Sequence, residues 1–182
     1  MNTNFEMVAK TFRGLEGVLA EELTALGASD VTPGNRMVSF SGDLAMLYKA
    51  NMCCRTALRI LKPFYTFEAG NPDELYAKVK EFDWSTIMNV NTTFSIDTVA
   101  YSDEFRNSQF VTYRVKDGIV DWFRDKFGDR ERPSVRIDGA ERIFNVHISG
   151  KTVTMSLDSS RLASCTDRSS YQRGACRRHH PA

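Results

Sequence analysis

In the first third of the chain, segments with the apolar spacing of a strand and segments with that of a helix follow one another in a definite order. This order restricts the fold more than any other feature of the sequence. Residues 5–10 read as a strand, and the next segment repeats apolar side chains at helical spacing. Two further strands are predicted over 29–33 and 35–41, then a short helix and a strand over 56–67. The order strand, helix, strand, strand, helix, strand is that of a ferredoxin-like subdomain, in which two helices cover one face of an antiparallel sheet.

The helices of this part carry their own boundary signals. Gly27 is predicted to close the first helix and Asp43 to cap the start of the second. Side chains at helical spacing are predicted to face the core: Leu15, Val18, Leu19, Leu23 and Leu26 from the first helix, and Leu44, Leu47 and Tyr48 from the second. Pro63 has no amide hydrogen, which predicts a bend or an edge there in the last strand.

A second α+β unit is predicted to follow. It begins with a helix carrying Leu75 and Val79 and continues with the alternating segment TTFSIDTVA. A long helix is predicted over 107–127, weakened at Gly118, and strands over 134–138, 142–149 and 152–158. The predicted organisation is therefore a ferredoxin-like subdomain at 1–67, a second domain at 68–160 and an irregular tail at 161–182.

Charge is distributed unevenly along the chain. The first 160 residues hold 19 basic and 22 acidic side chains, whereas the last 22 hold five arginines and one aspartate. A uniformly basic surface is therefore not expected on the body of the protein, and any contact with nucleic acid must come from a local cluster.

The sequence suggests a cytoplasmic protein. It has no apolar run long enough to span a bilayer, and its first residues do not resemble a signal peptide. The spacing of the four cysteines favours reduced thiols over disulfides.

No catalytic motif stands out. The sequence has no G-x-G-x-x-G turn, no Walker A and no H-E-x-x-H. His147 is interpreted as a structural or surface residue of a strand rather than a general base.

The densest polar patch lies where the long helix is predicted to begin. The candidate RNA-contacting residues there are Arg106, Asn107, Ser108, Gln109, Arg114 and Lys116. Free amides in the first turn of a helix favour an anion such as phosphate. The alternative, a capped helix with a solvated outer face, stays open.

Three segments in this order resemble one protein family. FRGLEGVLAEEL (12–23), RNSQF…KDGIVDWF (106–123) and MSLDSS (155–160) are similar to the N-terminal part of THUMP-domain RNA methyltransferases. The nearest group comprises bacterial enzymes that methylate N2 of a guanine in 23S rRNA, often labelled N6-adenine-specific DNA methylases. The resemblance covers residues 5–160.

This resemblance implies a THUMP domain at 68–160 that binds RNA and presents it to a catalytic domain. That catalytic domain binds S-adenosylmethionine and is missing from this chain, so the chain alone is expected to hold no cofactor, metal or activity, and to associate with no membrane. The expected partner is RNA, most simply 23S rRNA. Two other readings stay open: the THUMP module of a tRNA-modifying enzyme, and a ferredoxin-like interaction module without RNA affinity.

The tail departs from the family pattern. Residues 161–182 contain no Val, Ile, Phe, Met or Trp. Codons for 170–181 can be chosen so that the frame one nucleotide later reads Pro-Ile-Asn-Glu-Val-Leu-Ala-Ala-Gly-Ile-Ile-Leu, close to the helix that opens the family's catalytic domain. The tail is therefore interpreted as an out-of-frame segment. A zinc site at Cys165, Cys176, His179 and His180, or a basic RNA-binding arm, are the alternatives.

Overall fold

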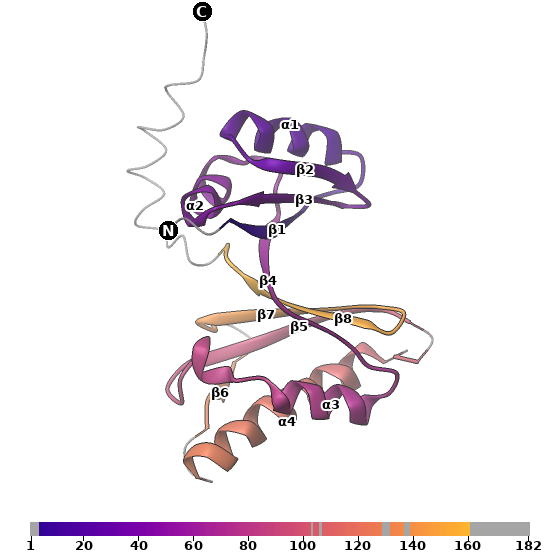
Figure 1. Cartoon of the computed structure of the whole chain (residues 1–182), viewed down its shortest axis with the longest axis vertical. Helices are drawn as coiled ribbons and strands as arrows, with labels where there is room; N and C mark the ends of the chain where they lie inside the picture. The colour runs from indigo at the N-terminus through magenta and orange to yellow at the C-terminus, as the bar shows by residue number, and fades with distance from the viewer. Residues whose placement is uncertain (1–3, 103, 106, 129–131, 137–138, 161–182) are drawn as a thin grey trace, which may run out of the picture. The chain divides into compact units, whose positions relative to one another are not determined.

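The computed structural model describes residues 4–160 except 103, 106, 129–131 and 137–138 (Figure 1). The described chain divides into two compact units. One contains residues 4–63 together with 158–160, and the other contains the described residues of 64–157. None of the helices in the described ranges is long and apolar enough to cross a membrane.

The first unit has the ferredoxin-like order predicted from the sequence. Its elements are β1 (Phe5–Lys10), α1 (Glu16–Leu26), β2 (Ser29–Gly34), β3 (Met37–Gly42), α2 (Leu44–Cys53) and the start of β4 (Arg59–Glu68). The strands lie in the order β2-β3-β1-β4, and every pairing is antiparallel. The part of β4 that pairs with β1 ends at Leu61. Pro63 lies beyond it, where the missing amide hydrogen costs no hydrogen bond to β1.

The predicted caps of this unit are confirmed. Gly27 has a left-handed backbone (φ 95°) and donates its amide hydrogen to the carbonyls of Leu23 and Thr24. Asp43 accepts a hydrogen bond of 2.8 Å from the amide of Met46, which fixes the start of α2.

Three residues predicted to face the core are exposed instead. They are Val18 of α1, and Leu44 and Tyr48 of α2. With α2 starting at Leu44, its inward stripe is Met46, Leu47 and Ala50, which places Leu44 and Tyr48 on the flanks. Val18 lies one residue, or about 100° of helix rotation, from the buried Leu19.

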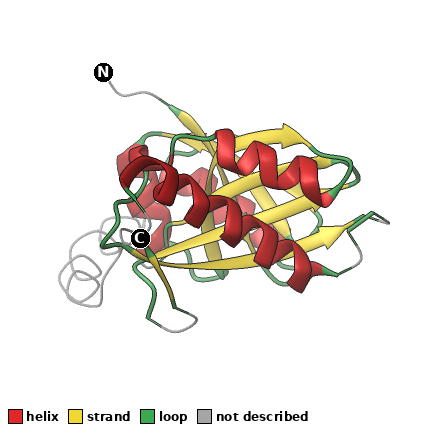
Figure 2. Ribbon diagram, turned by 90° about the horizontal axis from the view of Figure 1, so that it is seen from below, coloured by secondary structure: helices red, strands yellow, loops and turns green. Residues whose placement is uncertain are grey.

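The second unit places helices on one face of a mixed sheet. Its helical elements are α3 (Pro72–Glu81), the 3₁₀ turn η1 (Trp84–Thr86) and α4 (Ser108–Phe127). Its strands are β5 (Thr93–Tyr101), β6 (Ser134–Val135), β7 (Arg142–Ser149) and β8 (Thr152–Asp158), in the order β4-β8-β7-β5-β6. β5 runs parallel to β6 and β7, and β7 and β8 form an antiparallel hairpin. Seen from below in Figure 2, the helices of this unit lie in front of the strands.

The predicted elements of this unit form, with one shorter than expected. The strand predicted over 134–138 is the two-residue β6, and 137–138 lie outside the described residues. Asn107 caps α4 and the helix itself begins at Ser108.

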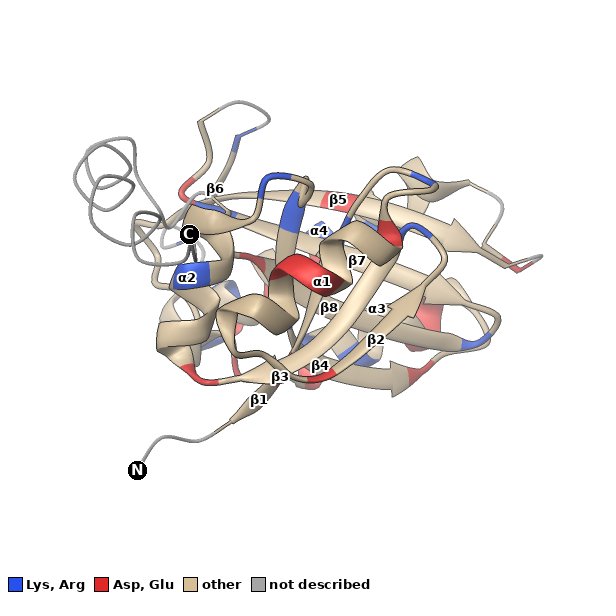
Figure 3. Cartoon of the chain, turned by 90° about the horizontal axis from the view of Figure 1, so that it is seen from above, with Lys and Arg blue, Asp and Glu red and all other residues tan. Residues whose placement is uncertain are grey.

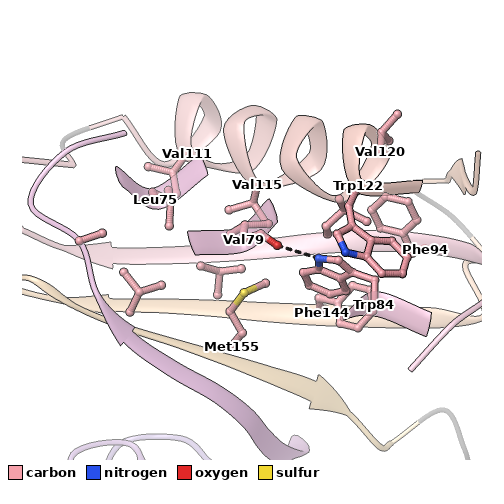
Figure 4. Packing of buried hydrophobic residues seen from close by; sticks show 14 of the residues in the cluster. Leu75, Val79, Trp84, Phe94, Val111, Val115, Val120, Trp122, Phe144 and Met155 are labelled. Carbon is pink, nitrogen blue, oxygen red and sulfur yellow. Dashed lines mark hydrogen bonds between the residues drawn. The ribbon is translucent and has the colours of Figure 1, made fainter. Parts of the chain in front are cut away.

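Trp84 organises the core of the second unit. The indole is fully buried, and its Nε1 donates a hydrogen bond of 2.8 Å to the carbonyl of Val79 (Figure 4). Rings of Phe82 and Phe144 pack edge-on against it at centroid distances of 5.1 and 5.5 Å. This cluster fixes the α3–η1 corner against the sheet, and α4 packs over it.

Candidate functional site

The start of α4 is built by a side-chain cap. The Asn107 side-chain oxygen accepts a hydrogen bond of 3.1 Å from the amide of Phe110. Ser108 and Gln109 occupy the exposed first turn that follows. Arg106, the remaining member of the predicted start, lies outside the described residues.

One face of α4 brings two of the predicted residues together. Gln109 Nε2 lies 3.4 Å from the hydroxyl of Tyr113, and Lys116 Nζ lies 5.3 Å from the centroid of the same ring. Lys116 also forms an ion pair of 3.0 Å with the carboxylate of Asp117. The spacing i, i+4, i+7 places Gln109, Tyr113 and Lys116 along one stripe of the helix.

Arg114 does not belong to that stripe. Its guanidinium pairs with the carboxylate of Asp73 on α3 and lies 5.1 Å from the ring centroid of Tyr76. The Nε of Arg114 is buried and has no hydrogen-bond partner among the described atoms. Arg114 therefore ties α4 to α3, whereas Gln109 and Lys116 point elsewhere.

The seam between α3 and α4 is a continuous polar network. The hydroxyl of Tyr76 donates to the carboxylate of Asp121 at 2.8 Å, and Arg124 pairs with Asp121 at 3.3 Å. Desolvation, with the bond to Asp121, raises the pKa of Tyr76. Lys80 pairs with Asp125 at 2.7 Å, which raises the pKa of that lysine. The charges of this seam are matched to one another.

Two aromatic residues beside the predicted patch were missed by the sequence reading. Phe110 and Tyr113 are 48% and 51% exposed. Both lie off the buried stripe of Val111, Val115 and Ile119. Their spacing relative to that stripe is the signal in the sequence that indicates their exposure.

His147, the histidine considered as a general base in the sequence, does not lie on the surface at the start of α4. His147 lies on β7, with its ring 5.8 Å from the ring of Tyr101 at the end of β5. Asn145, on the same face of β7, is buried. Within the described part of the chain, no group of three or more His, Cys, Asp or Glu side chains could hold a metal ion. The proposed zinc ligands Cys165, Cys176, His179 and His180 lie outside the described residues.

Basic and acidic residues are interspersed in the described chain, as the scattered blue and red segments in Figure 3 show. Lys78 pairs with Glu81 at 2.9 Å, and Arg59 lies 3.8 Å from the buried carboxylate of Asp158. Much of the basic charge is thus locally compensated, which agrees with the acidic balance of the first 160 residues.

Two hollows among the described residues differ from a pocket for a nucleotide-like cofactor such as S-adenosylmethionine. A hollow between α2 and β4, lined by Asn51, Cys54 and Ser160 among others, has a volume of about 40 Å³, whereas pockets for ligands of this size have roughly 300–1,000 Å³. A hollow of about 310 Å³ over β1, β2 and β3 is open and carries the carboxylates of Glu6 and Asp30. Neither combines the enclosure and the glycine-rich turn that a nucleotide-like group requires.

Two family models match the chain. The RlmL ferredoxin-like domain matches residues 6–61, and the THUMP domain matches residues 69–158. The ribosomal RNA large subunit methyltransferase K/L of Syntrophotalea carbinolica is 36% identical over 158 residues, which make up 87% of this chain and 22% of that protein. The chain therefore spans only a minor part of this relative.

Solved structures share the same fold. A predicted N6-adenine-specific DNA methylase from Listeria monocytogenes superposes with a TM-score of 0.71 and 26% identity, over 86% of this chain and 40% of that one. SMU.472, solved in complex with SAH, superposes with a TM-score of 0.72 and 25% identity, over 87% of this chain and 42% of that one. In both, the similar region is less than half of the neighbour's chain.

Proposed function

Because the chain belongs to the family in which an RlmL ferredoxin-like domain precedes a THUMP domain, we propose that it is the RNA-binding part of an RNA methyltransferase. The observation that carries the proposal is the order of the two matches, 6–61 and 69–158, in a chain related to a ribosomal RNA large subunit methyltransferase. The two units would act as one module that holds RNA for a catalytic domain in a longer protein. The proposed functional domains are residues 1–67 and 68–160, followed by the tail.

The finer proposal is that the substrate is 23S rRNA and that the methylated atom is N2 of a guanine. The name of the Syntrophotalea relative supports the large-subunit RNA, and the family resemblance of the sequence supports the guanine. The bound SAH of SMU.472 supports S-adenosylmethionine as the methyl donor of the longer protein. That cofactor supplies the methyl group when bound there, and no step of the transfer is assigned to this chain. The reaction would take place in the cytoplasm.

The proposed RNA contacts are those at the start of α4. Asn107, Ser108 and Gln109 offer amide and hydroxyl groups on an exposed turn. Lys116 adds a positive charge about two turns later, on the same stripe as Gln109. Such groups hydrogen-bond phosphates and 2′-hydroxyls. Arg106 joins this proposal from the sequence alone. Arg114 also stays in it, although its pairing with Asp73 must loosen before it can reach a phosphate.

A binding comparison tests the proposal. Fluorescence anisotropy would measure the affinity of the 182-residue chain for 23S rRNA fragments, tRNA and duplex DNA of equal length, at about 50 mM salt. The proposal predicts the tightest binding to an rRNA fragment. Tighter binding to tRNA would replace the rRNA assignment by a tRNA-modifying enzyme. Absence of binding to every RNA would leave a ferredoxin-like interaction module without RNA affinity and overturn the proposal.

A further inference from the structure

Two large aromatic side chains stand side by side on the outer surface of α4. Phe110 and Tyr113 are 48% and 51% exposed and lie three residues apart, so they are neighbours on the helix surface. Burial of such rings is favourable, and an exposed pair next to polar groups is typical of a binding surface.

Neither ring has an aromatic partner within the described residues. Phe127, at the other end of the same helix, is 49% exposed but stacks on Phe123 at 5.9 Å and contacts Trp122. The neighbours of the Tyr113 ring are polar. Tyr113 is flanked by the amide of Gln109 and the ammonium group of Lys116.

The other faces of α4 are already occupied. The side toward β5 carries Val111 in the core and Thr112, whose hydroxyl is 2.8 Å from that of Thr98. The side toward α3 carries Gly118 and the Arg114–Asp73 pair. The aromatic pair therefore serves neither contact and is available to a partner outside this unit.

We propose that Phe110 and Tyr113 stack on unpaired bases of the RNA, with Gln109 and Lys116 contacting its backbone beside them. This inference rests on the proposed function and specifies the form of the RNA, a single-stranded loop, bulge or end. Every base presents a flat π face that stacks on Phe or Tyr, whereas a duplex keeps these faces inside its stack.

The charge of the chain supports stacking as a main source of affinity. The first 160 residues carry three more acidic than basic side chains, and Lys116 is partly neutralised by Asp117. Attraction to phosphate from this surface is therefore modest. Stacking on neutral rings does not depend on net charge, and a cation beside the ring adds to it.

The test uses an unstructured fluorescent 12-nucleotide RNA, alone and annealed to its complement, with the 182-residue chain. The double variant Phe110→Leu/Tyr113→Leu keeps apolar bulk and helix propensity but removes both π faces. It should bind the single strand about tenfold or more weakly, with duplex binding unchanged. Tyr113→Phe, which keeps the ring but loses the hydroxyl near Gln109 Nε2, should bind the single strand more tightly than the double variant does. Single-strand affinity of the double variant within about twofold of wild type would overturn the inference, as would an equal loss on single strand and duplex.

A fluorescence readout guards against a folding defect. Phe110→Trp places an indole at the exposed position. Its emission, taken as the difference from the wild type with Trp84 and Trp122, should be quenched when the single-stranded RNA binds. Binding without quenching would contradict stacking at this position. If the wild type binds no RNA at all, the proposed function itself fails. If the wild type binds RNA and the double variant binds equally well, only the stacking site fails.

Discussion

Gly118 of α4 lies against Val79 of α3 so closely that a Cβ atom at position 118 would come within 2.9 Å of Val79 Cγ1. The glycine that weakens α4 as an isolated helix is thus what lets the two helices approach. Since α3 and α4 form one layer over the sheet, this contact sets the position of the helix that carries the proposed RNA surface.

Gly118→Ala should destabilise the protein in spite of the better helix propensity of alanine. Alanine gains about 1 kcal/mol within a helix, but overpacking against Val79 costs about 1–3 kcal/mol. We expect the free energy of unfolding, measured by urea titration, to fall by up to about 2 kcal/mol. The matched control is Gly17→Ala in α1, where no atom lies within 4 Å of the added Cβ, and which should raise stability by up to about 1 kcal/mol. A stabilised Gly118→Ala variant would show that the helices do not meet there.

Asp43→Ala should destabilise the first unit through its cap. The carboxylate satisfies the amide of Met46 at 2.8 Å, and loss of such a cap costs about 1 kcal/mol. Asp43→Ser, which can accept the same bond, should retain most of the stability in thermal unfolding. Equal stability of the alanine variant and the wild type would show that the Asp43 cap does not stabilise the first unit.

Substitutions of Arg114 and Lys116 should differ in their effect on stability, because only Arg114 contacts α3. Arg114→Gln breaks the contacts with Asp73 and Tyr76 and should lower the free energy of unfolding by about 1 kcal/mol.

Lys116→Gln should leave stability nearly unchanged but reduce the salt dependence of RNA binding, lowering the slope of log K against log salt by about 0.7. If Lys116→Gln leaves the salt dependence of RNA binding unaltered, Lys116 does not contact the RNA backbone.

Cys54 should be a poorly reactive thiol in the folded protein. Burial, assisted by Glu22 and Cys53, raises the pKa of Cys54 from 9.0 to about 12. At pH 8 the native thiol stays protonated, so alkylation by iodoacetamide, followed by mass spectrometry, should be much slower than in urea. A rate at Cys54 equal to that of the unfolded chain would contradict this environment.

The raised pKa of Cys54 also makes the stability of the protein fall as the pH rises above 9. Between pH 9 and about 12 the folded state keeps the Cys54 proton that the unfolded state loses. This contribution to stability is therefore complete below pH 9 and declines as the pH rises. Thermal unfolding at pH 8 and pH 10 should show a larger loss for the wild type than for Cys54→Ala.

Much of the fold could be predicted because local signals and tertiary structure agree. Gly27 and Asp43 fix helix ends by backbone chemistry that is readable in the sequence. The inward stripe of α2 was misplaced because Leu44 and Tyr48 are as apolar as the residues that are buried, and only the exact start of the helix decides between them. Apolar composition alone does not give that register.

The candidate site was only partly predictable, for a different reason. The pair Arg114–Asp73 joins residues 41 positions apart on two helices, so no local sequence pattern indicates that this arginine is engaged in packing. The role of Gly118 likewise depends on where Val79 lies. Phe110 and Tyr113 are exposed because they lie off the buried stripe of α4, and the position of that stripe depends on how the helix packs.

We expect the two folded units to bind RNA without help from the basic tail. The direct measurement is the affinity of a chain in which the five tail arginines are replaced by serine, which removes the positive charge of residues 161–182. We expect saturable binding of this variant to a 23S rRNA fragment at about 50 mM salt, and weaker binding when the salt is raised to about 200 mM. Loss of all RNA binding in this variant, with an unchanged thermal unfolding midpoint, would place the affinity in the tail and contradict the account.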